Sequence, residues 1–423
     1  MIEISFLGAM GTVGNSAILV DTATEKILLD YGTRPREIPP KFPIPLPGKP
    51  DTVLLSHCHL DHSGALPLFF RDTEILPIYG INITRPLTEL LLLDSIKVSR
   101  EEGIELPFER KEIWRTLKNF VDVNYREEFK IHRSKITLYD AGHVPGSAIV
   151  SIVSGKKHLL YTGDFNTIDT RLLRKCDEIK EPVDVMMVES TYSDRDHPPR
   201  KSQEKELIKI VRQTLANDGV ALIAGFAIGR IAELLLTLDA YGIDYPVFVD
   251  GMAKKAITIT NRYRNLLSHP KSLDKTLEKV EYVTKHGVRK KIVNEPCVIL
   301  TTSGMVQGGP IVYYLKKLYD KKFCSLVLAG WQLEGTPGKT LLETGRYINE
   351  KFGLNLEVKM LVRRLDFSSH VGRSELFKFI EKVNPEKVFC IHGDHTEEFA
   401  NELRKRGFDA VAPVASNRVF RID

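Results

Sequence analysis

The sequence predicts an α/β protein built from two units, and three observations support this. Short apolar runs recur along the chain and end at glycine-containing turns, as buried strands of a sheet do. Longer stretches with helical character alternate with them, for example at residues 88–98, 200–217 and 231–240. The length of 423 residues leaves room for two domains.

The composition is that of an ordinary globular protein, with 43% hydrophobic and 27% charged residues. No segment approaches the roughly 18 to 20 unbroken apolar residues that cross a membrane. The five cysteines are scattered and form no Cys-x-x-Cys pair, which disfavours a disulfide framework and a thiolate zinc site. We therefore expect a cytoplasmic protein that does not contact a membrane.

The net charge of +5 is too small to indicate nucleic-acid binding by itself. It is unevenly placed, because residues 194–361 carry a net charge of +8 and the two flanks are slightly acidic. A basic middle segment suits a polyanionic substrate. A solvated, lysine-rich surface explains the same charge equally well.

The beginning of the chain is expected to form three strands, at residues 2–7, 17–20 and 26–29. The turn at residues 8–16 contains several glycines but lacks the spacing of a phosphate-binding loop. Asp30 follows the third strand, where a carboxylate could orient a metal-binding histidine. The proline-rich segment 38–50 is expected to be a surface loop.

A concentration of imidazole and carboxylate groups follows the strand expected at residues 52–55. His57, His59, Asp61 and His62 lie within six residues. Cations such as zinc prefer these ligands, and a turn that leaves a strand can aim several of them at one point. A lone histidine is more often a plain core or surface residue, but this spacing hardly arises by chance. The motif therefore predicts a metal site.

Helices are expected after this motif, at residues 63–68, 88–98 and 104–120. Two further potential ligands follow predicted strands: His143 comes after residues 135–139, and Asp164 comes after residues 158–161. Each lies in a glycine-containing turn. Both are expected to extend the metal site.

The second half of the chain contains a continuous apolar run at residues 183–188, which leads into the segment Glu-Ser-Thr-Tyr that begins at Glu189. Strands expected at 219–223, 298–300 and 325–328 alternate with helices, and this alternation suggests a second α/β unit. Two later segments, Asp-Phe-Ser-Ser-His and Cys-Ile-His-Gly-Asp, contain His370 and His392.

This ordered set of motifs resembles the β-CASP ribonucleases, a branch of the metallo-β-lactamase fold. His-x-His-x-Asp-His, Gly-His-x-x-Gly-Ser around His143 and Thr-Gly-Asp at Asp164 resemble the successive metallo-β-lactamase motifs. Glu189, His370 and His392 match the three β-CASP motifs. Asp-Phe-Ser-Ser-His resembles the short archaeal homologue of the cleavage and polyadenylation specificity factor nuclease subunit more closely than the related ribonuclease J.

The resemblance implies a metallo-β-lactamase αββα sandwich with an inserted α/β β-CASP domain. Residues 1–193 and 362–423 would form the discontinuous metallo-β-lactamase domain, and residues 194–361 the β-CASP domain. It also implies two zinc ions. Their ligands would be His57, His59 and His143 for one ion, and Asp61, His62 and His392 for the other, with Asp164 bridging. The catalytic residues would be His370 as general acid, Glu189 as its support, and Asp61.

We therefore expect a zinc-dependent ribonuclease that hydrolyses RNA phosphodiester bonds by a two-metal mechanism, as an endonuclease, a 5′–3′ exonuclease or both. Its partner would be single-stranded RNA, and a homodimer or an association with a larger β-CASP homologue stays open. Candidate substrate contacts in the basic segment are Arg230, Lys254, Lys255, Ser303 and Lys339. A single basic residue of this kind is more often a plain surface charge. The alternatives are a DNA repair nuclease of the same branch and a non-catalytic RNA-binding scaffold, although a scaffold has no need of the complete ligand set.

Overall fold

The computed structural model describes residues 1–34, 37, 39–71, 75–416 and 418–423. This described chain separates into two compact units. The first consists of Met1–Asp169, Lys175–Asp196 and Ser369–Asp423, and the second of Thr170–Arg174 and His197–Ser368. The first unit is therefore discontinuous in sequence. Among the described helices, none is long and apolar enough to cross a membrane.

The N-terminal strands form one sheet of the first unit. Over the described residues its order is β22-β1-β2-β3-β4-β5-β6. The strands are β1 (Ile2–Phe6), β2 (Ile18–Asp21), β3 (Lys26–Leu29), β4 (Thr52–Leu54), β5 (Ile78–Ile81), β6 (Phe120–Val123) and β22 (Val419–Ile422). β3 and β4 are parallel, with Leu29 opposite Leu54. Both strands thus end at the same edge, which brings Asp30 beside the histidine motif.

A second sheet of the first unit has the order β21-β20-β11-β10-β9-β8-β7 over the same residues. Its strands are β7 (Glu128–Ile131), β8 (Ser134–Asp140), β9 (Ala148–Ser154), β10 (Lys157–Tyr161), β11 (Val185–Glu189), β20 (Lys387–Ile391) and β21 (Asp409–Val411). β10, β11 and β20 run parallel, with Tyr161 opposite Met187 and Glu189 opposite Ile391. Side chains that follow these three strands therefore meet at one edge of the sheet.

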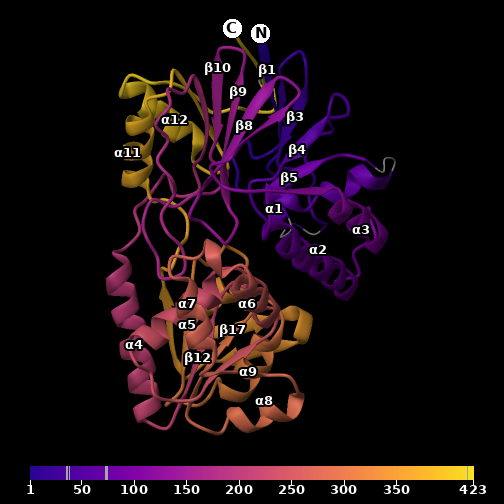
Figure 1. Ribbon diagram of the computed structural model, residues 1–423. Helices are drawn as coiled ribbons and strands as arrows, with labels where there is room; N and C mark the ends of the chain where they lie inside the picture. Colours follow the sequence, from indigo (N-terminus) through magenta and orange to yellow (C-terminus); the bar gives the residue numbers. More distant parts are fainter. Residues whose placement is uncertain (35–36, 38, 72–74, 417) are drawn as a thin grey trace. The chain divides into compact units, whose positions relative to one another are not determined.

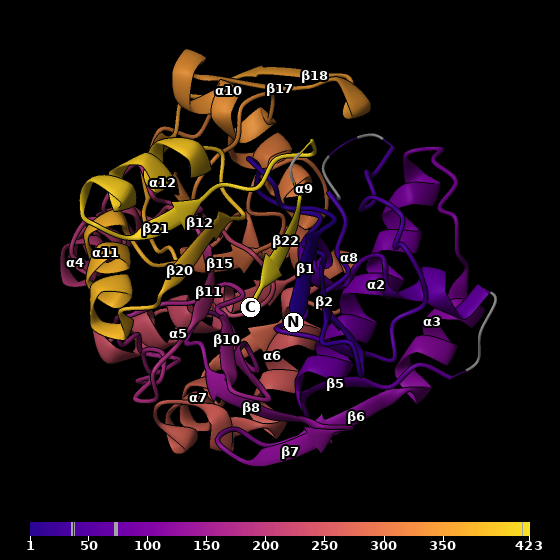
Figure 2. The ribbon, with the colours of Figure 1, turned by 90° about the horizontal axis from the view of Figure 1, so that it is seen from above.

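Helices cover the outer faces of the two sheets. They are α2 (Thr84–Glu101) and α3 (Arg110–Lys118) on the first sheet, and α11 (Arg373–Val383) and α12 (Thr396–Lys405) on the second (Figures 1 and 2). Ile113 of α3 belongs to one apolar core with Ile78 of β5, and Phe399 of α12 to another with Val388 of β20. Between the sheets, the ring of Phe389 lies 5.0 Å from that of Phe6. This layering confirms the predicted αββα sandwich.

The second unit is built on a parallel sheet with the order β14-β13-β15-β12-β16-β19 in the described chain. Its strands are β12 (Val220–Ala224), β13 (Val247–Asp250), β14 (Val280–Tyr282), β15 (Cys297–Thr301), β16 (Ser325–Ala329) and β19 (Leu361–Leu365). Parallel strands need crossover connections, and helices supply most of them here. Because β19 pairs with β16, this unit continues to Ser368.

Both faces of this parallel sheet are buried under helices. One apolar core contains Ile223 of β12 and residues of α4 (Arg200–Ala216), α5 (Arg230–Ala240), α6 (Ala253–Arg262) and α7 (Pro270–Leu277). The opposite core contains Leu222 and residues of α8 (His286–Ile292), α9 (Pro310–Leu318) and α10 (Pro337–Thr344). Sheets covered on both faces have apolar strands throughout, which explains the continuous apolar runs in the sequence. A separate hairpin joins β17 (Arg346–Asn349) to β18 (Leu354–Glu357).

Two of the expected helices have different bounds in the structure. The segment 63–68 does not begin an α-helix: α1 (Leu60–Ser63) starts inside the histidine motif, and a 3₁₀ helix, Leu66–Arg71, follows it. Pro67 has no N–H to continue α1, but its fixed φ suits the start of a new helix.

The helix expected at residues 104–120 covers only Arg110–Lys118. Glu109 and Glu112 form a capping box at its start, which satisfies amide groups that a helix leaves unbonded at that end. Phe120 belongs instead to β6, where it pairs with Ile78.

Candidate metal centre

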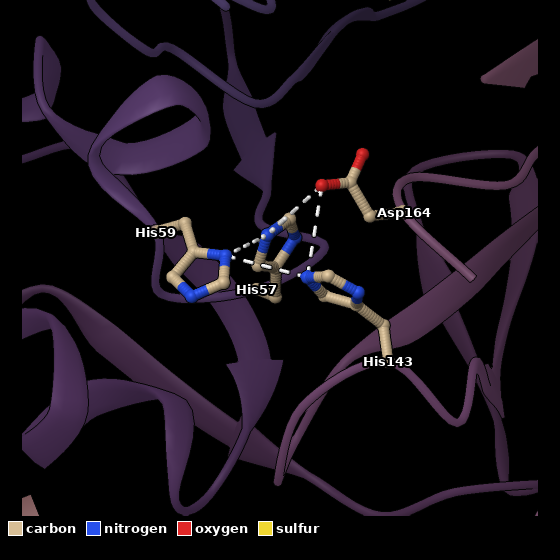
Figure 3. A group of neighbouring side chains, drawn as sticks. All are labelled: His57, His59, His143 and Asp164. Carbon is tan, nitrogen blue, oxygen red and sulfur yellow. Dashed lines mark hydrogen bonds and ion pairs between the residues drawn. The ribbon is translucent and has the colours of Figure 1, made fainter. Parts of the chain in front are cut away.

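Three imidazoles and one carboxylate converge on a common point in the first unit (Figure 3). His59 Nδ1 lies 3.1 Å from His57 Nε2 and 3.3 Å from His143 Nε2. Asp164 Oδ2 lies 3.6 Å and 3.7 Å from the same two Nε2 atoms. Ring nitrogens that face one another this closely direct their lone pairs to one centre, as the ligands of a tetrahedral metal ion do.

A second group of ligand atoms shares Asp164 with the first. Asp164 Oδ1 lies 3.4 Å from His62 Nε2 and 3.3 Å from His392 Nδ1, and His392 Nε2 lies 3.5 Å from Asp61 Oδ2. In each group the ligand atoms lie within 4.8 Å of one another, as do those of a third set, Asp164, Glu189 and His370. The two oxygens of Asp164 therefore face two different groups.

The ligands reach this point because they follow the ends of neighbouring strands. Asp164 follows β10 through Gly163, whose φ is +50°. A Cβ at residue 163 would lie 2.7 Å from the Ser56 Cβ, so only glycine lets the two sheets approach here. The turn of α1 that begins at Leu60 carries Asp61 and His62. His392 comes directly after β20.

Asp30 orients one of the ligands. It is fully buried, and its Oδ2 lies 2.6 Å from His62 Nδ1 and accepts hydrogen bonds from the Tyr161 hydroxyl at 2.6 Å and the Ser56 hydroxyl at 2.7 Å. With Nδ1 held in this way, the His62 ring presents Nε2 to Asp164. Asp30 thus contacts a histidine of the motif, as the sequence indicated.

His143 is oriented by a backbone group, since its Nδ1 lies 3.0 Å from the carbonyl oxygen of Ser369. Sequence reasoning missed this carbonyl, as well as Ser56 and Tyr161. Ser56 directly precedes His57 and Tyr161 ends β10, so closeness to a ligand was the available signal. Only the paired sheets show that both hydroxyls reach Asp30.

The chemistry of the donors fits a bound metal. Among the described residues, His62 Nε2, His392 Nε2 and Asp164 Oδ1 are buried polar atoms without a hydrogen-bond partner. A buried unsatisfied polar atom typically costs about 1 to 3 kcal/mol, which a bound cation would offset. Burial, together with the neighbouring imidazoles, lowers the pKa of His57 and His143 well below the usual histidine value. Both rings are therefore neutral, the form that binds metals.

An imidazole–carboxylate pair lies beside these groups. His370 Nδ1 is 2.9 Å from Glu189 Oε2, and Glu189 Oε1 accepts a hydrogen bond from the Phe165 backbone amide at 2.8 Å. Burial alone would lower the pKa of His370, but the charge and hydrogen bond of Glu189 outweigh it and raise the pKa to about 9. Because His370 Nδ1 faces Glu189, the ring presents its Nε2 edge in the opposite direction.

The substrate contacts expected in the second unit differ in their surroundings. The Lys339 ammonium lies 2.9 Å from a Glu334 oxygen and 2.8 Å from a Glu343 oxygen, so an RNA phosphate would compete with two carboxylates. Lys254 Nζ donates to the Val283 carbonyl and lies 3.7 Å from Asp250. Lys254 thus joins α6 to the segment after β14, whereas Lys339 pairs with carboxylates close to it in sequence.

The other three expected contacts lie on different elements of the second unit. The Ser303 hydroxyl accepts hydrogen bonds from the Gln307 and Gly308 amides at 3.2 Å and 3.4 Å, and so shapes its own turn. Arg230 begins α5. Lys255 is exposed on α6.

Family comparisons agree with this architecture. Residues 10–214 match the metallo-beta-lactamase superfamily, residues 231–341 the Beta-Casp domain, and residues 355–413 the Zn-dependent metallo-hydrolase RNA specificity domain. A solved structure of a protein of unknown function from Enterococcus faecalis has a TM-score of 0.62 and 14% identity, and the match covers 100% of both chains. This likeness concerns the fold.

Similar sequences come from archaea. A probable RNase, MJ4, of Methanocaldococcus jannaschii is 35% identical, over 99% of this chain and 99% of its own. RNase aCSPSF2 of Saccharolobus solfataricus is 35% identical over 97% of this chain and 83% of its own length. The transcription termination factor FttA of M. jannaschii is 33% identical, covering 96% and 69%. The chain therefore belongs to the metallo-β-lactamase superfamily and, within it, to the β-CASP family of metal-dependent hydrolases.

Proposed function

We propose that this protein is a zinc-dependent ribonuclease that hydrolyses RNA phosphodiester bonds with two metal ions. One observation carries the proposal: two ligand groups share Asp164, and the His370–Glu189 pair lies beside them in the same unit. The names of two relatives that match almost the whole chain, both RNases, support RNA as the substrate.

The residues that would hold the ions are His57, His59 and His143 for one and Asp61, His62 and His392 for the other, with Asp164 between them. Imidazole and carboxylate donors without thiolates suit zinc. When bound, such ions stabilise charge on phosphoryl oxygens and lower the pKa of water at the site.

The protein's own contribution to the reaction is proton transfer to the leaving group. Water at the site first loses a proton to solvent, and the hydroxide attacks phosphorus; as the bond from phosphorus to the leaving ribose oxygen breaks, His370 Nε2 gives its proton to that oxygen. The imidazole becomes neutral. It keeps the proton on Nδ1, which stays hydrogen-bonded to the Glu189 carboxylate 2.9 Å away. A carboxylate-held imidazole in this position is a suitable general acid. Asp61 belongs to the same machinery as a ligand of the second group.

The basic segment 194–361, with its net charge of +8, is proposed as the RNA-binding surface. Affinity for single-stranded RNA should then fall steeply as salt rises, with log K decreasing by about 0.7 per neutralised phosphate for each unit of log salt. Filter binding between low and physiological salt measures this slope. Replacing exposed Lys255 with glutamine should flatten it, whereas Lys339→Gln should change it less because Glu334 and Glu343 already hold that ammonium. A flat profile for the unaltered protein would rule out this surface.

The function itself is tested with RNA labelled at either end and carrying a 5′ triphosphate, monophosphate or hydroxyl. The zinc-loaded protein should cut RNA faster than a DNA strand of matched sequence. Release of mononucleotides from the 5′ end would indicate an exonuclease, and internal fragments an endonuclease. A protein that cuts only the DNA strand, or neither strand, would contradict the proposal.

A further inference from the structure

The hydroxyl of Thr191, in the turn that follows β11, contacts both parts of the site. Its Oγ1 lies 2.5 Å from Glu189 Oε2, 3.1 Å from the His392 carbonyl oxygen and 3.3 Å from His392 Nδ1. Glu189 holds the proposed acid, and His392 belongs to the second ligand group. One side-chain oxygen thus lies between two functional elements.

The single proton of this hydroxyl has two acceptors within reach. The Glu189 carboxylate is closer and charged, and hydrogen bonds to charged acceptors are roughly twice as strong as those between neutral groups. With its proton on Glu189, Thr191 Oγ1 offers a lone pair to the Nδ1 edge of His392. His392 Nδ1 lies 3.3 Å from both Thr191 Oγ1 and Asp164 Oδ1. A proton on Nδ1 leaves His392 Nε2, which is buried and has no hydrogen-bond partner in the described structure, as the metal-binding atom.

The Glu189 carboxylate depends on few donors. It is 1% exposed, so water contributes little to its position. Oε1 accepts from the Phe165 amide and lies 3.3 Å from His370 Nδ1, and Oε2 has shorter contacts with Thr191 and His370. Without the Thr191 hydroxyl, Oε2 would keep only the His370 imidazole of these two contacts.

We infer that Thr191 is a positioning residue for the reaction. Its hydroxyl fixes the Glu189 carboxylate, and through it the His370 ring, and steadies His392 from the opposite side. The acid and the second ligand group are thereby held in one relative geometry. This inference rests on the proposed RNA hydrolysis.

Thr191→Val tests the role of the hydroxyl, because valine keeps the branched shape and removes the donor. Loss of a group that orients ligands or catalytic side chains typically costs about 10- to 100-fold in activity or metal affinity. We expect kcat for RNA cleavage to fall by about tenfold or more with KM unchanged, and zinc to be lost more readily to a competing chelator. Thr191→Ser, which keeps the hydroxyl, should restore most of both quantities.

Thr116 provides a matched control. It lies in the same unit, is fully buried, and its hydroxyl donates to the Glu112 carbonyl at 2.8 Å within α3. Thr116→Val should change at most the thermal stability and leave kcat of the folded protein close to that of the unaltered protein.

Three results would overturn the inference: parental kcat in Thr191→Val, an equal loss in Thr191→Ser, or a loss that matches the fraction of unfolded protein. Failure of the proposed function is a separate result, since the unaltered protein would then not cleave RNA. Zinc retention would still decide the inference, and Thr191→Val holding zinc as tightly as Thr191→Ser would refute it.

Discussion

His370→Ala should cut RNA at least about 10²-fold more slowly than the unaltered protein while keeping its metal ions, its fold and most of its RNA affinity. The expected loss is that of a positioned general acid, because the leaving oxygen would depart without a proton. Metal retention follows from geometry: His370 Nδ1 faces Glu189 at 2.9 Å and lies 4.0 Å from Asp164 Oδ2. Single-turnover cleavage, elemental analysis and RNA binding measure the three quantities.

His395 is the matched control for this variant. It lies in the first unit, is about half exposed, and its contact with Asp194 is 3.9 Å long. His395→Ala should keep the parental rate. If His370→Ala also cleaved at that rate, or lost metal as completely as a ligand variant, the Glu189–His370 pair would be a structural contact only.

Asp164→Ala should lose at least one metal ion and, with it, the activity. The unaltered protein should contain close to two zinc ions per chain, one for each of the two groups that contain His57 and His62. A third set, Asp164, Glu189 and His370, lies within the same 4.8 Å, but its imidazole Nδ1 is already 2.9 Å from Glu189. Removing the shared carboxylate leaves two divalent charges facing each other without the negative charge between them. Their repulsion is strong in a buried site of low dielectric constant.

Elemental analysis of the purified, unchelated protein measures this change. Asp169→Ala removes an exposed carboxylate a few residues further along the chain and should leave the zinc content unchanged. Two retained ions in a folded Asp164→Ala protein would show that Asp164 does not bridge them. A folded, unaltered protein without zinc would contradict the metal assignment as a whole.

Sequence reasoning could identify groups that are close in sequence or that follow a clear strand. The segment from His57 to His62 stands out by its composition, and Asp30 follows a strand whose apolar pattern is unambiguous. Strand ends are local features, set by a few residues and a turn. The α/β class could be predicted for the same reason.

Contacts that depend on pairing between distant segments could not be derived in this way. Phe120 has helical neighbours but joins β6 because Ile78 lies opposite it. Tyr161 reaches Asp30 across 131 positions of sequence, and no local pattern marks that contact. Lys339 shows another limit of the sequence. Its positive charge suggested RNA binding, but its two carboxylate partners, Glu334 and Glu343, become evident only in the structure.

The discontinuity of the first unit determines the order in which its parts are made on the ribosome. Residues 1–196 contribute the His57, His59, His143 and Asp164 group early, but His370 and His392 belong to the returning segment, Ser369–Asp423. A nascent chain that ends before this segment lacks both the proposed acid and one ligand of the second group. Synthesis must therefore bring in the last part of the first unit before the protein can act on an RNA, including the messenger that encodes it.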